Sequence, residues 1–196
     1  MLKRIFDIIC SLIGILILSP LFLVVSLAII INSGFPVFYL QTRVGKNKSD
    51  FKLFKFRTMH TNADKKGLLT VGGRDPRITG VGYYLRKYKI DELPQLFNVL
   101  IGNMSLVGPR PEVRKYVEMY TAEQLLVLSV KPGITDFASL KFINENELLS
   151  ASSNPEKTYI EEIMPQKLAL NKKYMDKKGF LMDVKIIFAT LRKIVS

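Results

Sequence analysis

Two adjacent carboxylates, Asp91 and Glu92, stand directly after a short basic run and before a proline. The basic residues upstream are Arg86, Lys87 and Lys89. Because Pro94 suits a first helical turn, we expect a helix to begin here, where acidic side chains cap free amides and suit the helix dipole. A chemical interpretation stays open beside capping: the cations and the dipole would keep Asp91 ionised as a nucleophile, while Glu92 binds a hard cation. Neighbouring helical side chains point about 100° apart, so the two carboxylates can serve different purposes.

The chain holds few other groups suited to covalent or metal chemistry. One cysteine, Cys10, and one histidine, His60, exclude a disulfide scaffold, a zinc site and a Cys/His dyad. No P-loop is present, and Gly80-Val81-Gly82 is too short a match to a dinucleotide-binding fingerprint. The remaining chemistry is that of carboxylates, lysines and arginines. That combination suits phosphoryl transfer, in which Mg²⁺ and cationic side chains neutralise phosphate charge.

Further cations lie on two predicted short strands, Val37–Gln41 and Phe51–Thr58, around the polar turn Gly45–Asp50. Side chains alternate along a strand, so Lys55 and Arg57 share one face. Two cations on one face could hold a phosphate. A solvated basic strand face explains them equally well.

Two loops follow in the sequence. Residues 61–80 are rich in glycine, aspartate and threonine, which is typical of a loop. The segment Gly108-Pro109-Arg110-Pro111 is a stiff loop, because its prolines fix the backbone around one guanidinium.

The other segments have helical periodicity or helix-end signals. The expected helices start near Val81, at Ile90, at the capping box Thr121-x-x-Gln124 and at Asn154-Pro155, the last being interrupted by Pro165 and ended by Gly179. A final apolar stripe either docks on the body or lies on a membrane surface. It consists of Leu181, Val184, Phe188, Leu191 and Val195. We therefore expect an α+β fold, mainly helical, with a small β component.

The N-terminal segment is apolar enough to enter a membrane. Ile8–Ile31 is a run of 24 uncharged residues, 17 of them Leu, Ile, Val or Phe, which exceeds the ~7–15 apolar residues of a signal peptide. Ser19-Pro20 interrupts it at the middle, and each piece, ~18–21 Å long, falls short of a ~30 Å hydrocarbon core. Basic residues flank both ends, which favours a re-entrant helix-break-helix hairpin over a kinked spanning helix. We expect a membrane hairpin over residues 1–35 and a compact domain over residues 36–196.

The charge of the chain is uneven. Its 29 basic and 17 acidic residues give a net charge of +12, and residues 42–90 alone hold 13 basic and 3 acidic residues. A basic segment beside a membrane suits anionic lipids and polyanionic substrates. The same charge would suit a membrane-tethered nucleic-acid-binding protein, but we find no nucleic-acid-binding motif or stacking platform and expect no nucleic-acid partner.

The string Ile90–Pro111, IDELPQLFNVLIGNMSLVGPRP, closely resembles the bacterial sugar transferases, the monotopic phosphoglycosyl transferases. The resemblance covers nearly the whole chain in order. It includes Lys3-Arg4-x-x-Asp7, Ser19-Pro20, Gln41-Thr42-Arg43-x-Gly45, Lys55-Phe56-Arg57-Thr58-Met59, Asp75-Pro76-Arg77-Ile78-Thr79, Leu85-Arg86 and Lys131-Pro132-Gly133-Ile134-Thr135.

The resemblance implies transfer of a sugar 1-phosphate from a UDP-sugar to undecaprenyl phosphate at the cytoplasmic face of the bacterial inner membrane. It implies that Asp91 forms a covalent phosphosugar intermediate with release of UMP, that Glu92 binds Mg²⁺, and that Ser19-Pro20 turns the helix back. It also implies that cations bind the substrate phosphates. The candidates are Lys55, Arg57, Arg77, Arg86 and Arg110.

Two segments depart from the pattern expected of the family. Asn103 stands where many members have aspartate, and Asp136-Phe137-Ala138-Ser139-Leu140 replaces a Gly-x-x-Gln pattern in a region that we expect to shape the sugar pocket. A non-catalytic adaptor in glycan assembly is the alternative, and the intact dyad argues against it. The sequence leaves the UDP-sugar, the glycan and any homo-oligomer undetermined.

Overall fold

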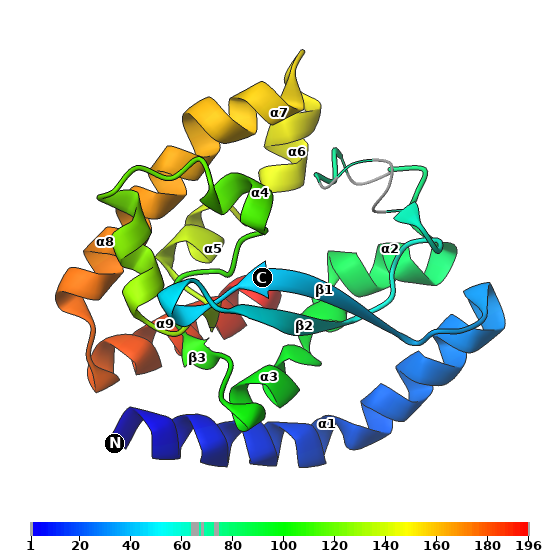
Figure 1. Cartoon of the computed structure of the whole chain (residues 1–196). Helices are drawn as coiled ribbons and strands as arrows, with labels where there is room; N and C mark the ends of the chain where they lie inside the picture. Colours follow the sequence, from blue (N-terminus) through cyan, green and yellow to red (C-terminus); the bar gives the residue numbers. More distant parts are fainter. Residues whose placement is uncertain (1, 64–66, 68, 73–74, 196) are drawn as a thin grey trace.

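A computed structural model of the chain describes residues 2–63, 67, 69–72 and 75–195, and of residues 194–195 the backbone only. A long helix, α1 (Leu2–Ser33), runs along one edge beneath a body of short helices (Figure 1). The body also holds two sheets of two strands each. This confirms the mainly helical fold with a small β component. Part of the predicted loop over residues 61–80 lies outside the described residues.

Helix α1 passes through Pro20 without a break. Proline removes the N–H that would bond the carbonyl of Leu16, and the hydroxyl of Ser19 donates to that carbonyl at 2.8 Å instead. The ribbon changes direction between its two halves (Figure 1). The Ser-Pro pair therefore bends a continuous helix, whereas the helix-break-helix interpretation required an interruption.

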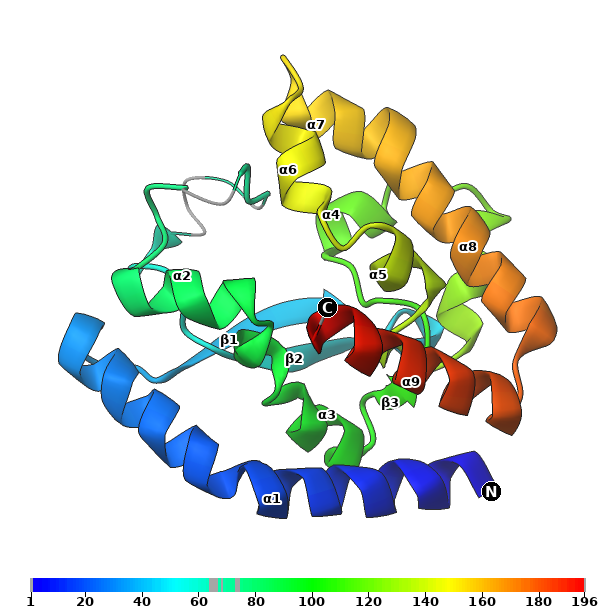
Figure 2. The same cartoon turned by 180° about the vertical axis from the view of Figure 1, so that it is seen from behind.

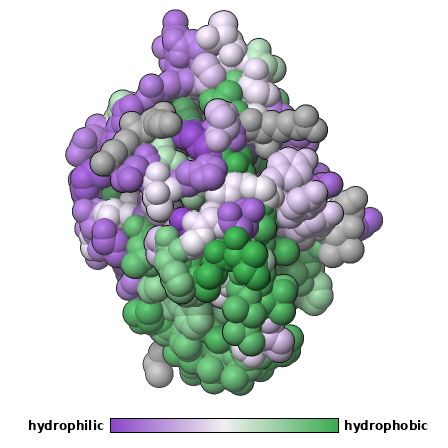
Figure 3. Space-filling view, turned by 90° about the vertical axis from the view of Figure 1, so that its right-hand side faces the viewer, coloured by the Kyte–Doolittle hydropathy of each residue, from purple (hydrophilic) through white to green (hydrophobic). Residues whose placement is uncertain are grey.

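One face of α1 packs on the body, and its other faces are exposed. Phe22, Val25 and Ile29 form a core cluster with Phe56 and Leu85. Side chains that point the other way are apolar and open, which gives the lower part of the molecule a continuous hydrophobic surface (Figure 3). By length and composition, α1 could cross a membrane, and it is the one such helix in the described part of the chain.

Strands β1 (Phe38–Val44) and β2 (Asp50–Phe56) pair antiparallel around a short 3-10 helix, η1 (Lys46–Lys48), which confirms the predicted hairpin. Strands β3 (Ser105–Val107) and β4 (Gly133–Thr135) pair in parallel.

The carboxylate dyad lies between two helices. Helix α2 (Gly80–Lys87) begins at Thr79, whose side chain accepts from the backbone N–H of Gly82. A 3-10 turn, η3 (Ile90–Glu92), then carries both carboxylates into α3 (Gln95–Ile101). Gly102 ends α3 with φ +105°, a conformation that glycine adopts at little cost. The sequence placed the dyad in the first α-helical turn, but the structure places it in η3.

The second half of the chain consists mainly of helices (Figures 1 and 2). They are α4 (Arg114–Val117), η4 (Gln124–Ser129), α5 (Phe137–Lys141), α6 (Glu145–Ser150), α7 (Pro155–Thr158), η5 (Tyr159–Ile163), α8 (Met164–Lys177) and α9 (Phe180–Val195). The predicted capping box is present, since Thr121 and Gln124 exchange side-chain bonds with each other's N–H. The predicted interruption at Pro165 takes the form of a π-helical turn, η5, before it.

Helix α9 docks by a different face from the predicted stripe. Asp183 and Ile186 are buried against the body, whereas Leu181, Phe188 and Leu191 are 76%, 68% and 56% exposed. The prediction that α9 docks on the body through this apolar stripe is therefore wrong for Leu181, Phe188 and Leu191. An outward apolar stripe fits the alternative of a membrane surface.

Candidate active site

Glu92 is held by two cations. The guanidinium of Arg110 donates to both carboxylate oxygens, with Nη1 at 3.0 Å from Oε2, and Lys55 Nζ lies 3.0 Å from Oε1. Although burial alone would raise the pKa of Glu92, Arg110 and Lys55 hold it well below its usual range. Glu92 is therefore ionised, and two of the predicted phosphate-binding cations, Lys55 and Arg110, lie together beside the dyad.

Asp91 is in a different environment from its neighbour. Its side chain is buried, and it accepts no hydrogen bond from any residue that the structure describes. Burial, together with the charge of Glu92, raises the pKa of Asp91, although Lys55, Arg86 and Lys89 oppose the shift. From the sequence we expect nearby cations and a helix dipole to lower the pKa of Asp91. The structure shows that burial of its side chain, which the sequence does not reveal, has the larger effect and raises this pKa. Neither η3 nor α3 has a side-chain cap, so capping does not account for the dyad.

Arg86 approaches the dyad from α2. Its Nη2 donates to Thr70 Oγ1 at 2.9 Å and its Nη1 to Thr58 Oγ1 at 3.5 Å. Both partners are neutral, and Arg86 forms no ion pair with a carboxylate of the described residues, so its charge can attract an anion.

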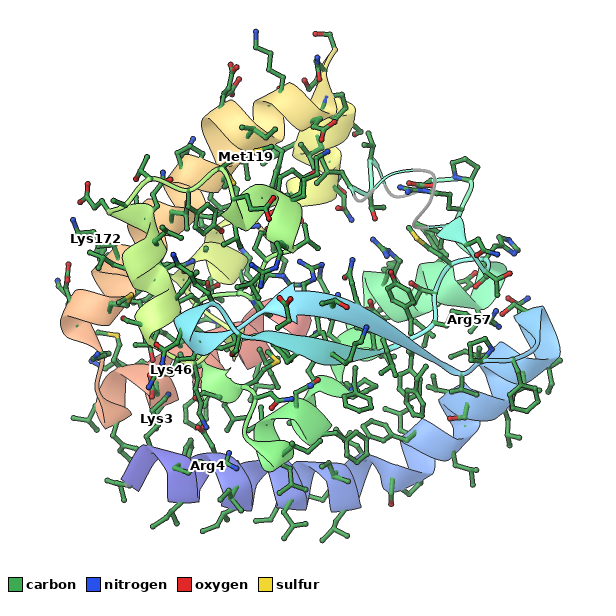
Figure 4. The ribbon with its side chains drawn as sticks, in the orientation of Figure 1. Lys3, Arg4, Lys46, Arg57, Met119 and Lys172 are labelled. Carbon is green, nitrogen blue, oxygen red and sulfur yellow. The ribbon has the colours of Figure 1, made fainter. Side chains whose placement is uncertain are left out.

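Arg57 and Arg77 are committed to the fold. Arg57 is buried and its Nη2 donates to the carbonyls of Ser33 and Gly34, which ties the end of α1 to the body (Figure 4). Arg77 forms an ion pair with Asp75, and it donates to carbonyls of the loop, including Gly67 at 2.6 Å. Both line the same cavity as the dyad. The bonds of Arg57 are to Ser33 and Gly34, with its Nε left without a partner among the described residues, and those of Arg77 are to loop carbonyls and Asp75.

Asn98 joins the dyad segment to the strand that carries Lys55. Its side chain is fully buried, with Nδ2 donating to the carbonyl of Lys52 at 2.7 Å and Oδ1 accepting from the N–H of Phe54 at 2.9 Å. These two bonds fix β2 against α3, which places the ammonium group of Lys55 beside the carboxylate of Glu92. The sequence does not single out Asn98, since an asparagine inside an apolar helix carries no specific signal.

A second polar group was also missed. Glu112 accepts from Arg43 Nη1 at 3.0 Å and from the hydroxyl of Tyr159. Burial would raise the pKa of Glu112, but Arg43 and Lys167 lower it overall. Only the position of Glu112 directly after the Gly-Pro-Arg-Pro loop could have drawn attention to it.

These groups share one cavity of about 890 Å³. Its wall includes Asp91, Glu92, Lys55, Arg86 and Arg110. It also includes the contacting group Arg43, Glu112, Tyr159 and Lys167. A buried carboxylate beside uncommitted positive charge can attack an electrophilic centre that carries negative charge, such as a phosphate.

Comparison with known proteins agrees with this chemistry. Residues 1–196 match the family described as bacterial sugar transferase. The chain is 37% identical over 198 residues to a UDP-N-acetylgalactosamine-undecaprenyl-phosphate N-acetylgalactosaminephosphotransferase of Aeromonas hydrophila, covering 100% of this chain and 44% of that protein. It is 38% identical to the uncharacterized sugar transferase EpsL of Bacillus subtilis, covering 99% and 87%. It is 34% identical to a UDP-glucose:undecaprenyl-phosphate glucose-1-phosphate transferase of Escherichia coli, covering 98% and 40%. The chain thus spans less than half of the Aeromonas and Escherichia relatives.

Proposed function

Since the chain belongs to the bacterial sugar transferase family, we propose that it transfers a sugar 1-phosphate from a UDP-sugar to undecaprenyl phosphate. The relatives from Aeromonas and Escherichia are named for reactions of this kind. The observation that carries the proposal is the dyad itself: Asp91 accepts no hydrogen bond from a described residue, while Glu92 is fixed by Lys55 and Arg110 in the same cavity.

The first half-reaction uses Asp91 as the nucleophile. A carboxylate oxygen attacks the β-phosphorus of the UDP-sugar, and the bond from that phosphorus to the bridging oxygen breaks. UMP leaves with the bridging oxygen and its electron pair, and the phosphosugar stays on Asp91. A phosphate oxygen of the acceptor lipid then attacks the same phosphorus and releases the Asp91 carboxylate.

The cations stabilise charge in both steps. Arg110 presents a planar fork, and Lys55 and Arg86 add positive charge around the dyad. In the absence of substrate, the single charge of Glu92 offsets part of the charge of Arg110 and Lys55, which lowers the cost of burying them. A bound diphosphate competes for the same donors.

Mg²⁺ fits the dyad as a hard cation among oxygen ligands. A carboxylate offers about four lone-pair positions, of which Arg110 and Lys55 use three on Glu92, and Asp91 adds a second carboxylate. We propose that Glu92 holds the ion together with substrate phosphates, and that the ion neutralises charge on the leaving phosphate.

We also propose a re-entrant topology at the bacterial cytoplasmic membrane. Both ends of α1 contact the same body: Arg4 donates to the carbonyls of Val99 and Leu100 at one end, and Arg57 holds the other (Figure 4). A helix whose two ends meet one domain has them on one side of the bilayer. Because its outer faces are apolar, α1 would dip into the cytoplasmic leaflet with the compact domain on the cytoplasmic face.

An assay of UMP release tests the proposed function. Purified protein, Mg²⁺ and undecaprenyl phosphate would be incubated with a panel of UDP-sugars. We expect UMP and a lipid diphosphate sugar from at least one member of the panel. No UMP from any of them, together with salt-dependent binding to DNA, would instead support the nucleic-acid alternative.

A further inference from the structure

The cavity over the dyad is lined by two groups of residues of different chemistry. One group is charged and polar: Arg43 and Tyr159 both donate to Glu112, and Lys167 lies over the ring of Tyr159. The other group, here called the apolar arm, consists of Phe6 and Cys10 of α1, Leu96 of α3, Ile134 of β4 and Ile187 of α9. A ligand that contacts both groups must carry a charged part and a long apolar part.

The elements around the apolar arm contact one another directly. Asp7 of α1 accepts from the N–H of Leu106 in β3 at 3.1 Å, and the rings of Phe6 and Phe180 lie 5.1 Å apart. Across the arm, the hydroxyls of Thr135 and Thr190 lie 2.6 Å apart and join β4 to α9. The elements that carry the lining residues of the arm therefore pack against one another, and Figure 2 shows α1, α3 and α9 close together.

The apolar arm begins at the catalytic dyad. Leu96 follows Glu92 by one helical turn, and both line the cavity. On the opposite side, the N–H of Arg110 donates to the side chain of Asp136, the residue directly after β4. A chain lying in the arm would therefore end at Arg110 and the dyad.

Helix α1 leaves room in the arm through small side chains. Cys10 and Gly14 are one turn apart on the same face, and both line the cavity. A side chain at Gly14 would meet Leu96 at 3.2 Å, so α1 and α3 approach closely there. Ile9 and Ile13, which are their direct neighbours, are 51% and 50% exposed and point outward.

We propose that the apolar arm binds the isoprenoid units next to the phosphate of the acceptor lipid and thereby places that phosphate at Arg110 and the dyad. The inference rests on the proposed function, because it assigns the place of the acceptor in that reaction. The sugar nucleotide is polar and takes the part of the cavity around Glu112. The distal part of the lipid lies in the bilayer along the exposed faces of α1 and α9.

Photo-crosslinking tests the assignment without requiring turnover. The probe is farnesyl phosphate with a diazirine on its first isoprenoid unit, added to the full chain and to Asp91→Asn. We expect labelled peptides from α1 around Cys10 and from α9 around Ile187. Labelling confined to the outer faces of these helices, or to other elements, would overturn the assignment.

A bulky side chain that occupies the arm should slow only the second half-reaction, the transfer to the acceptor lipid. Cys10→Phe displaces about two methylene groups of the lipid, so we expect transfer of the phosphosugar to undecaprenyl phosphate to slow about tenfold. UMP release in the absence of acceptor should persist, which also shows that the variant folds. Ile9→Phe is the matched control, because it adds the same ring to the outward face.

The possible results distinguish failure of the lipid site from failure of the proposed function. Equal transfer rates for Cys10→Phe and Ile9→Phe would contradict the arm while leaving the reaction intact. If wild-type protein releases no UMP but labels at α1 and α9, the proposed function fails and the arm stands as a lipid phosphate site. Should Cys10→Phe fail to fold, Ile187→Trp narrows the arm from α9 and carries the same expectation.

Discussion

At the residue scale, Arg110 and Glu92 make a bidentate contact that a lysine cannot reproduce. Arg110→Lys keeps the charge but loses the fork that would hold a diphosphate. We expect turnover to fall about a hundredfold, as when one oxyanion donor is removed. The melting temperature should change by less than about 3 °C, since the ion pair survives. Near-normal turnover would argue against a direct role for Arg110.

The pH profile of the first half-reaction should reflect two shifted groups. Burial raises the pKa of Asp91, so the nucleophile is lost to protonation, as pH falls, at higher pH than an ordinary aspartate. Burial, aided by Arg110 and opposed by Glu92, lowers the pKa of Lys55, so its charge is lost, as pH rises, at lower pH than an ordinary lysine. The rate should therefore decline on both sides of an optimum.

A substitution tests whether loss of the Lys55 charge causes the decline in rate at high pH. In Lys55→Arg the cation stays protonated, so the alkaline decline should move to higher pH. Lys52→Arg is the matched control, because Lys52 lies on the same strand but is exposed and bonds to Thr42. An unchanged alkaline decline in Lys55→Arg would remove Lys55 from the explanation.

The sequence identified the charged residues of the site better than it identified which of them are free to bind a ligand. The Asp91-Glu92 pair, Lys55 and Arg110 come from three separate segments, and the structure brings them to one cavity. Arg57 and Arg77 belong to equally basic motifs but bind carbonyls and Asp75. Which cation faces a ligand depends on tertiary contacts that spacing does not encode.

At the element scale, the site depends on how β2 is joined to α3. Asn98→Ala would leave the N–H of Phe54 and the carbonyl of Lys52 without their buried partner, at a cost of about 2–4 kcal/mol in the free energy of unfolding. Thermal unfolding should show a clear loss of stability, with reduced UMP release. Asn103→Ala, on an exposed asparagine, should change the unfolding free energy by less than about 0.5 kcal/mol. Equal stability of the two variants would contradict this role.

Helix ends lie where the sequence predicts them when a specific capping motif marks them. The capping box at Thr121 is present as predicted. Pro20 bends α1 without breaking it, because the Ser19 hydroxyl bonds the carbonyl that proline leaves free. The docking face of α9 was misjudged, since an apolar stripe can face lipid as readily as a core.

At the scale of the whole molecule, the two ends of α1 should face the same compartment. Single cysteines placed at Leu2 and at Phe35, in a Cys10→Ser background, should both react with a membrane-impermeant thiol reagent only when the cytoplasmic side is open. Ser153→Cys, on an exposed part of the compact domain, supplies the cytoplasmic reference. Labelling of positions 2 and 35 from opposite sides would reject re-entry in favour of a spanning helix.

The central claim is that Asp91 carries the phosphosugar between the two substrates. Purified protein would be incubated with a UDP-sugar that supports UMP release, and Mg²⁺, without acceptor lipid, and the peptide containing Asp91 would be analysed by mass spectrometry. The account predicts a mass increase of one phosphosugar on that peptide, stoichiometric UMP, and loss of both in Asp91→Asn, because an amide does not attack phosphorus. An adduct that persists in Asp91→Asn, or UMP release that requires both substrates bound together, would contradict it.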